Sequence, residues 1–96
     1  MRPLQTELIH VGFGNFIAAN RVVAIVSPGS APIQRKVREG KRKGLIIDIT
    51  QGRRTKAVVF MDDGSTILAA ISPEAIAGRV AAHRSPGSRL AQAPLD

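Results

Sequence analysis

Cysteine, tryptophan and tyrosine are absent from this 96-residue chain, and phenylalanine, with three copies, is the sole aromatic residue type. Without cysteine the chain can form neither disulfides nor thiolate zinc sites. With so few aromatic rings, base stacking of the kind used by RNA-recognition motifs is disfavoured. The hydrophobic core must therefore be aliphatic, built from isoleucine, valine, leucine and alanine.

Acidic residues and long apolar runs are also scarce. Seven Asp and Glu stand against fourteen Lys and Arg, which gives a net charge of +7. In a small domain this excess indicates a polyanionic partner such as DNA, RNA or an anionic membrane surface. No apolar run approaches the roughly 20 residues of a membrane helix, and the first seven residues contain no apolar signal core. We therefore expect a soluble, cytoplasmic protein with no membrane partner.

The apolar pattern predicts an α+β fold: a small, mostly antiparallel β-sheet with two helices. A chain of this length has room for one hydrophobic core. Helices are expected over 30–43 and 73–83, because a capping serine and an early proline open each segment. Residues 1–84 should form the domain, and residues 85–96 a disordered tail. Strands are expected at 4–11, 22–26, 45–49, 55–61 and 66–71, and residues 16–18 form a short apolar segment.

The most informative stretch joins a cluster of cations to a strand. Arg53, Arg54 and Lys56 place three cations in four residues at the entrance to the apolar run 57–61. Arginine presents a planar fork of donors that fits phosphate oxygens or a guanine edge. The pattern therefore predicts arginines aimed outward from one end of a sheet at a nucleic acid. Arg21 precedes an earlier apolar strand in the same way, although a solvated edge charge explains that residue equally well.

The segment 34–43 carries six basic residues and a single acid, Glu39. Gly40 weakens the helix expected there by about 1 kcal/mol relative to alanine. A helix that binds membranes needs a bulky apolar face, which this segment lacks. A solvated helix face and a contact with a polyanion both remain open for its cations.

Catalytic and metal-binding patterns are weak throughout. His10 and His83 are isolated, and a hairpin tip accounts for Asp62 and Asp63. The loop 12–14 begins like a dinucleotide-binding loop but lacks the third glycine and the following helix. We therefore expect no enzyme, no cofactor, no metal site and no small-molecule substrate.

Five short motifs occur in order along the chain. They are Gly12-Phe13-Gly14-Asn15, Ala19-Asn20-Arg21, Ser27-Pro28-Gly29-Ser30-Ala31-Pro32, Gly52-Arg53-Arg54-Thr55 and Val58-Val59-Phe60-Met61-Asp62. Together they resemble the RemA family of bacterial extracellular-matrix regulatory proteins, over residues 5–82. The basic segment 34–43 is a region in which members of that family vary, and the tail lies outside the resemblance.

The resemblance implies a DNA-binding transcriptional regulator that activates biofilm matrix genes. It also implies closed rings of identical subunits whose arginines contact double-stranded DNA. By motif, the DNA-binding arginines of that family correspond to Arg21, Arg53 and Arg54, and the charge pattern adds Lys56 as a neighbouring contact. The partners so implied are duplex DNA and further copies of the same chain.

A ring would present several weak DNA contacts at high effective concentration and would favour bending or wrapping of the duplex. Self-association is expected at the sheet edges or at small apolar residues. Two alternatives remain: an RNA-binding ring or ribosome-associated protein, and an oligomeric scaffold for an acidic protein partner. The small residues considered for self-association are Ala69, Ala70, Ala77 and Ala81.

Overall fold

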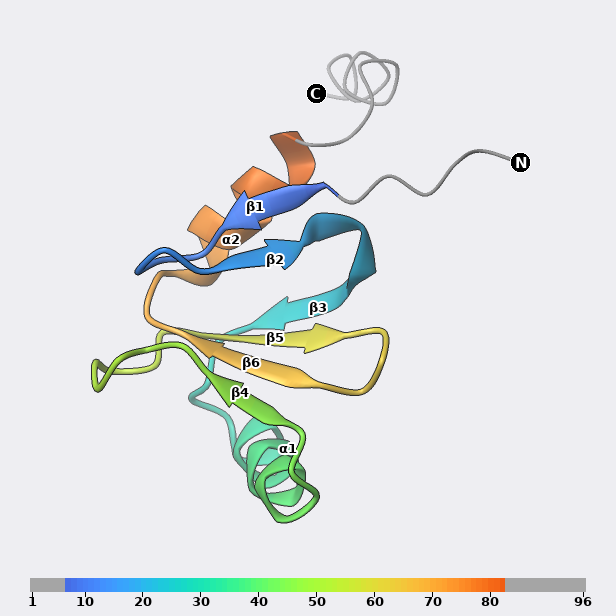
Figure 1. Ribbon diagram of the computed structural model, residues 1–96. Coiled ribbons are helices and arrows are strands. Elements are labelled where there is room, and N and C mark those ends of the chain that lie inside the picture. Colours follow the sequence, from blue (N-terminus) through green and yellow to red (C-terminus); the bar gives the residue numbers. More distant parts are fainter. Residues whose placement is uncertain (1–6, 83–96) are drawn as a thin grey trace, which may run out of the picture.

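The computed structural model describes residues 7–82, and Figure 1 shows its helices and strands. The expected tail 85–96 and His83 lie outside the described residues. In chain order the elements are β1 (Leu8–His10), β2 (Phe16–Ala18), a 3-10 turn (Ala19–Arg21), β3 (Val22–Val26), α1 (Ala31–Arg42), β4 (Ile46–Asp48), β5 (Ala57–Met61), β6 (Thr66–Ala69) and α2 (Pro73–Ala82).

The strands form two sheets. β1 and β2 make an antiparallel hairpin, and the other four strands form a sheet in the order β3-β5-β6-β4. β5 pairs antiparallel with both β3 and β6, whereas β4 runs parallel to β6. The predicted class, an α+β fold with a mostly antiparallel sheet and two helices, is confirmed.

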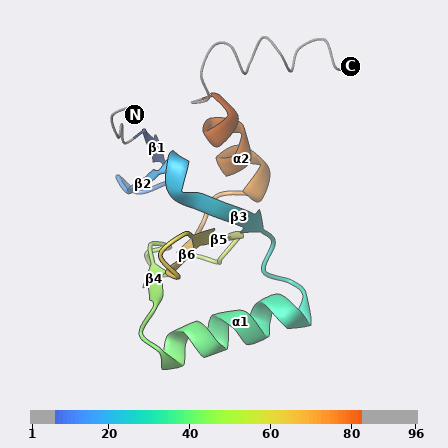
Figure 2. The same cartoon turned by 90° about the vertical axis from the view of Figure 1, so that its right-hand side faces the viewer.

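The four-stranded sheet is covered on both faces. α2 and the β1-β2 hairpin lie on one face, and α1 lies on the other (Figures 1 and 2). Because side chains alternate along a strand, neighbouring residues of β5 point to opposite layers. Val59 belongs to the core under α2 and the hairpin, and Val58, also fully buried, faces the α1 layer. The main core is aliphatic, as predicted, and consists of Ile9, Val11, Ile17, Ala19, Ala57, Val59, Ile67, Ala69 and Ile76.

Gly40 explains how α1 sits against the sheet. The Ser30 hydroxyl accepts a hydrogen bond from the Ile33 amide at 3.4 Å and caps the helix N-terminus. Ten residues further on, Gly40 is buried, and a Cβ added there would lie 2.9 Å from Cδ1 of Ile46 in β4. The glycine that weakens the helix in isolation therefore allows it to approach β4 closely.

Two of the predicted strands are shorter in the structure than the sequence pattern indicated. The strand expected at 55–61 begins only at Ala57, so Thr55 and Lys56 lie in the loop that also carries Arg53 and Arg54. Strand pairing also ends at Ala69 rather than at Ile71. Ala69 is fully buried in the core, so it is not available for contact between subunits.

Candidate nucleic-acid interface

The loop between β4 and β5 presents Arg53 and Arg54 to solvent, and both side chains are exposed. The Arg53 amide donates to the carbonyl oxygen of Thr50 at 3.0 Å, which closes a turn. Gln51 and Gly52, the two residues inside this turn, have positive φ angles of 53° and 81°. The loop therefore has a defined backbone conformation that only a few residue types adopt without strain.

Asp48, the last residue of β4, anchors the start of this loop. Its carboxylate accepts hydrogen bonds from the backbone amide of Thr50 at 2.9 Å and from the Thr50 hydroxyl at 2.7 Å. These two bonds stabilise the charged form and lower the pKa of Asp48 below its usual value, with Lys41 adding a smaller attraction. Thr50 is buried in this arrangement. The turn that carries Arg53 is therefore held by a charged cap.

A second loop reaches Arg53 from the β1-β2 hairpin. The guanidinium carbon of Arg53 lies 5.2 Å from the centroid of the Phe13 ring, within the range of a cation–π contact. Phe13 has a φ of 54° and lies between two glycines that also have positive φ. Figure 1 shows both loops at the same end of the molecule. The unusual backbone at 12–14 was predictable from its glycines, but its contact with Arg53 was not.

Lys56 lies in the same loop as the two arginines. Its amide donates to the carbonyl of Ala69 at 2.8 Å, which joins the end of the loop to β6, and its side chain is exposed. The structure thus brings Arg53, Arg54 and Lys56 together on one loop at one end of the sheet.

Arg21 lies at the opposite end of the sheet. β3 and β5 are antiparallel, with Val22 paired to Met61, so the residue that precedes β3 lies beside the residue that follows β5. The Asp62 amide donates to the Arg21 carbonyl at 2.9 Å, and Nε of Arg21 contacts Oδ1 of Asp62 at 3.0 Å in an exposed ion pair. β5 alone separates the two ends by about 14 Å. One subunit therefore does not gather its three predicted arginines into a single cluster.

The remaining candidates have structural partners. His10 accepts a hydrogen bond at Nε2 from the Gly14 amide at 3.2 Å, and its ring lies 5.2 Å from that of Phe16. Asp63 accepts bonds from the Ser65 amide and hydroxyl, which lower its pKa. Among residues 7–82, no group of three or more His, Cys, Asp or Glu is placed to hold a metal ion. Neither helix of the described chain has the length and apolarity needed to cross a membrane.

The structure is that of a small, basic α+β domain with exposed arginines at two ends of one sheet. The family model for RemA-like proteins, described as extracellular matrix regulatory protein A-like, matches residues 8–80. This chain belongs to the RemA-like family.

Curated relatives come from several bacterial groups. A protein of Dehalococcoides mccartyi is 55% identical over 78 residues, 81% of each chain. One from Synechococcus elongatus is 56% identical over 77 residues, which cover 80% of this chain and 88% of the relative. One from Pelotomaculum thermopropionicum is 47% identical over 83 residues, 86% of this chain and 91% of the relative. Each is named "Putative regulatory protein". Family membership supports a regulatory role rather than an enzymatic one.

Proposed function

We propose that the protein is a ring-forming, DNA-binding transcriptional regulator that activates matrix genes. Arg53 and Arg54, with Lys56 beside them, contact the phosphate backbone, and Arg21 contributes from the other end of the sheet. The observation that carries the proposal is the Arg53–Arg54 loop itself. Two adjacent guanidinium groups stand exposed on a turn that Asp48 caps and that Phe13 contacts. Guanidinium groups held in this way suit phosphate oxygens.

The separation of Arg21 from that loop supports an assembled binding surface. If subunits join around a ring, Arg21 of one subunit and the Arg53–Arg54 loop of the next face the duplex together. A few phosphate contacts per subunit then add up to a binding site with high effective concentration. A curved array of this kind bends or wraps the duplex and selects sequences that bend easily.

Exposed apolar side chains beside Arg21 support self-association. Phe16 and Ile47 are 57% and 49% exposed, and both line an open hollow of about 230 Å³ that Arg21 also borders. Apolar side chains that share one exposed hollow are typical of surfaces that a partner covers. We assign this surface to the contact between subunits of the ring.

The test is the salt dependence of binding to an A·T-rich duplex, measured with light scattering as a check on assembly. We expect the wild type to bind as an oligomer with a steep salt slope. The Arg53→Ala/Arg54→Ala variant should stay assembled and lose most of its affinity. The variant Lys41→Ala/Lys43→Ala removes the same charge from a different surface and should bind far better than the arginine variant.

Competition among duplex DNA, duplex RNA and single strands separates the alternatives. Preference for duplex RNA would replace the proposal with an RNA-binding ring. Absence of salt-dependent binding to any nucleic acid would favour a scaffold for an acidic protein. A monomeric or unfolded Arg53→Ala/Arg54→Ala protein would make these arginines structural and would remove them from the proposed DNA contact.

A further inference from the structure

We infer that the outer face of α1 is a second surface for the phosphate backbone of duplex DNA, built from Arg35, Arg38 and Arg42. This inference rests on the proposed function in taking duplex DNA as the partner. It adds a binding surface on the opposite side of the helix from the sheet, distinct from the Arg53–Arg54 loop.

Helix geometry places the three arginines together. Successive residues of an α-helix are about 100° apart, so Arg35, Arg38 and Arg42 fall within a sector of about 60°. Ile33, Val37 and Gly40 fall in an equally narrow sector on the opposite side. Gly40 is buried against Ile46 of β4, which fixes the inner face. The sector that points directly away from the sheet therefore holds all three arginines, with Ala31 as the other residue of α1 in it.

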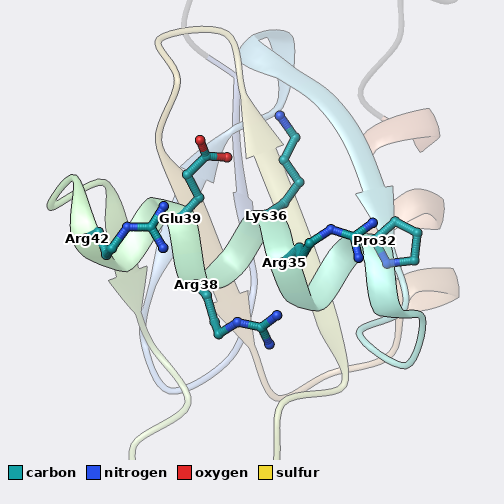
Figure 3. A pocket seen from close by; sticks show the side chains of 6 residues that line it. All are labelled: Pro32, Arg35, Lys36, Arg38, Glu39 and Arg42. Atoms are coloured by element: carbon teal, nitrogen blue, oxygen red, sulfur yellow. The ribbon is translucent and has the colours of Figure 1, made fainter.

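Figure 3 shows the side chains on α1 that line an open groove at this face. The groove has a volume of about 600 Å³. Glu39, its one acidic residue, points to the opposite side of the helix from Arg38 in this view. The Glu39 carboxylate lies 3.6 Å from Nζ of Lys43 and is therefore already paired. The residues that line the groove are Pro32, Arg35, Lys36, Arg38, Glu39 and Arg42.

Arg35, Arg38 and Arg42, here called the arginine stripe, take part in no ion pair with any of residues 7–82. The nearest pair, between Lys43 and Glu39, leaves all three guanidinium groups out. Three exposed guanidinium groups, spread along about 10 Å of helix, repel one another until an anion neutralises them. A row of phosphates provides that neutralisation and releases condensed counterions.

The position of α1 connects this stripe to both sets of proposed DNA contacts. β3 ends at Val26, which pairs with Val58 near the start of β5, so α1 begins at the end of the sheet that carries the Arg53–Arg54 loop. α1 then runs to the start of β4, where Ile46 pairs with Thr66, at the end that carries Arg21. The helix that carries the stripe therefore runs between the two arginine-bearing ends of the sheet (Figure 2).

Duplex DNA fits this face better than a membrane does. A helix that binds an anionic membrane inserts an apolar face into the lipid. The apolar side of α1, with Gly40 at its centre, is already packed on β4, and the exposed side offers no large apolar residue. What remains is charge with a planar donor geometry, which suits phosphate oxygens.

The experiment uses the full chain and a duplex of about 20 base pairs. The triple variant Arg35→Gln/Arg38→Gln/Arg42→Gln keeps helix propensity, because glutamine is a good helix former. Each phosphate contact contributes about 0.9 to the slope of log affinity against log salt. Loss of three contacts lowers the slope by about 2.7, so between 50 and 200 mM salt the wild type should lose about 40-fold more affinity than the variant.

Three further variants make the result specific. Arg38→Gln/Arg42→Gln removes two charges from the groove, whereas Lys41→Gln/Lys43→Gln removes two charges from the flanks of the helix and should lower the slope less. Arg35→Lys/Arg38→Lys/Arg42→Lys keeps the charge and should retain most of the wild-type slope. Equal slopes for the two double variants would overturn the inference, because only net charge would then matter.

The remaining outcomes distinguish this inference from the proposed function. One possible outcome is that the wild type binds DNA, Arg53→Ala/Arg54→Ala does not bind it, and Arg35→Gln/Arg38→Gln/Arg42→Gln keeps the wild-type salt slope. In that case the stripe is not a DNA surface, and the proposed function stands. If the wild type does not bind DNA, the proposed function is wrong, and the inference about the stripe is wrong with it. A loss confined to duplex RNA or to vesicles with anionic lipid also overturns the stripe as a DNA surface. If the triple variant unfolds, the single variants Arg35→Gln, Arg38→Gln and Arg42→Gln take its place. Each should lower the slope of log affinity against log salt by about 0.9, and an unchanged slope in all three would overturn the inference.

Discussion

Phe13 and Arg53 come from loops 40 residues apart, and the Arg53 guanidinium lies over the Phe13 ring at 5.2 Å from its centroid. A cation–π contact is an attraction between the charge and the face of the ring, so it does not use up the acceptor-binding capacity of the guanidinium N–H groups. The contact therefore restricts the arginine without occupying the donors that would contact phosphate. A side chain ordered before binding loses less entropy when DNA arrives.

We predict that Phe13→Leu weakens DNA binding although the number of cations is unchanged. A cation–π contact at an exposed site contributes about 0.5 to 1 kcal/mol, so the expected loss of affinity is about two- to fivefold. Fluorescence anisotropy with a labelled duplex measures it. Phe13→Tyr is the matched control, because it keeps an aromatic ring at the same position and should retain wild-type affinity. Equal affinities for Phe13→Leu and the wild type would show that the ring does not order Arg53 for binding.

The positive φ of Gly52 leads to a second prediction. At Gly52, with φ at 81°, no atom lies within 4 Å of an added Cβ, so Gly52→Ala meets backbone strain but no steric clash. Left-handed backbone costs a residue with a Cβ about 1 to 2 kcal/mol. We expect Gly52→Ala to lower the melting temperature and, by displacing the turn before Arg53, to weaken DNA binding.

Gly29→Ala provides the control for this strain. Gly29 also has open space around it but lacks the positive φ. It should leave both the melting temperature and DNA affinity near wild-type values. If Gly52→Ala and Gly29→Ala behave alike in both measurements, the loop does not depend on its left-handed residue.

The elements with strong local signals could be predicted from the sequence, and the placement of the arginines could not. Val22–Val26 is β-branched at four of five positions, and Ser30 followed by Pro32 opens a helix, so β3 and α1 follow from nearby residues. The strand order β3-β5-β6-β4 depends on pairing between residues far apart in the chain. The antiparallel direction of β3 and β5 within that order places Arg21 and Arg53 at opposite ends of the sheet.

Two further features could not be predicted from neighbouring residues, because they also depend on contacts between distant parts of the chain. Gly40 would destabilise an isolated helix, and only its position against Ile46 shows why a side chain does not fit there. The Phe13–Arg53 contact joins two loops whose proximity is set by the packing of the hairpin on the sheet. Propensity acts over a few residues, whereas these contacts require the finished fold.

Asp62 provides a third prediction, because it pairs with Arg21 at 3.0 Å and competes with phosphate for that guanidinium. Asp62→Asn keeps an oxygen that can accept from Arg21 and removes the negative charge. We expect tighter DNA binding at low salt and a smaller gain at high salt, since exposed charges are screened. The stability change should stay below about 1 kcal/mol, because exposed ion pairs contribute little.

The neighbouring carboxylate tests whether the pairing itself matters. Asp63→Asn removes the same charge, but Asp63 is hydrogen-bonded to Ser65 rather than to Arg21. Titration of both variants with the same duplex gives the comparison. A gain for Asp62→Asn that exceeds the gain for Asp63→Asn supports competition at Arg21, and equal gains would reduce the effect to net charge.

Asp48 leads to the last prediction, a specific loss of stability in acid. Hydrogen bonds from the Thr50 amide and hydroxyl lower the pKa of Asp48 in the folded protein. The unfolded chain then binds a proton more readily than the folded one, so stability from this group rises with pH. The contribution is complete above the unfolded pKa of about 3.9 and is lost as pH falls through the lower folded value.

The difference in free energy of unfolding between the wild type and Asp48→Asn isolates this group, because other carboxylates such as Asp63 titrate in both proteins. Urea titrations should show that the wild type is more stable than Asp48→Asn at about pH 6. The difference between their free energies of unfolding should shrink steadily below about pH 4. NMR titration of Thr50→Ala should show the pKa of Asp48 moving up toward its ordinary value, because the hydroxyl donor is gone. A difference that stays flat or grows in acid would mean that the carboxylate does not cap the loop, and Arg53 and Arg54 would then need another source of order.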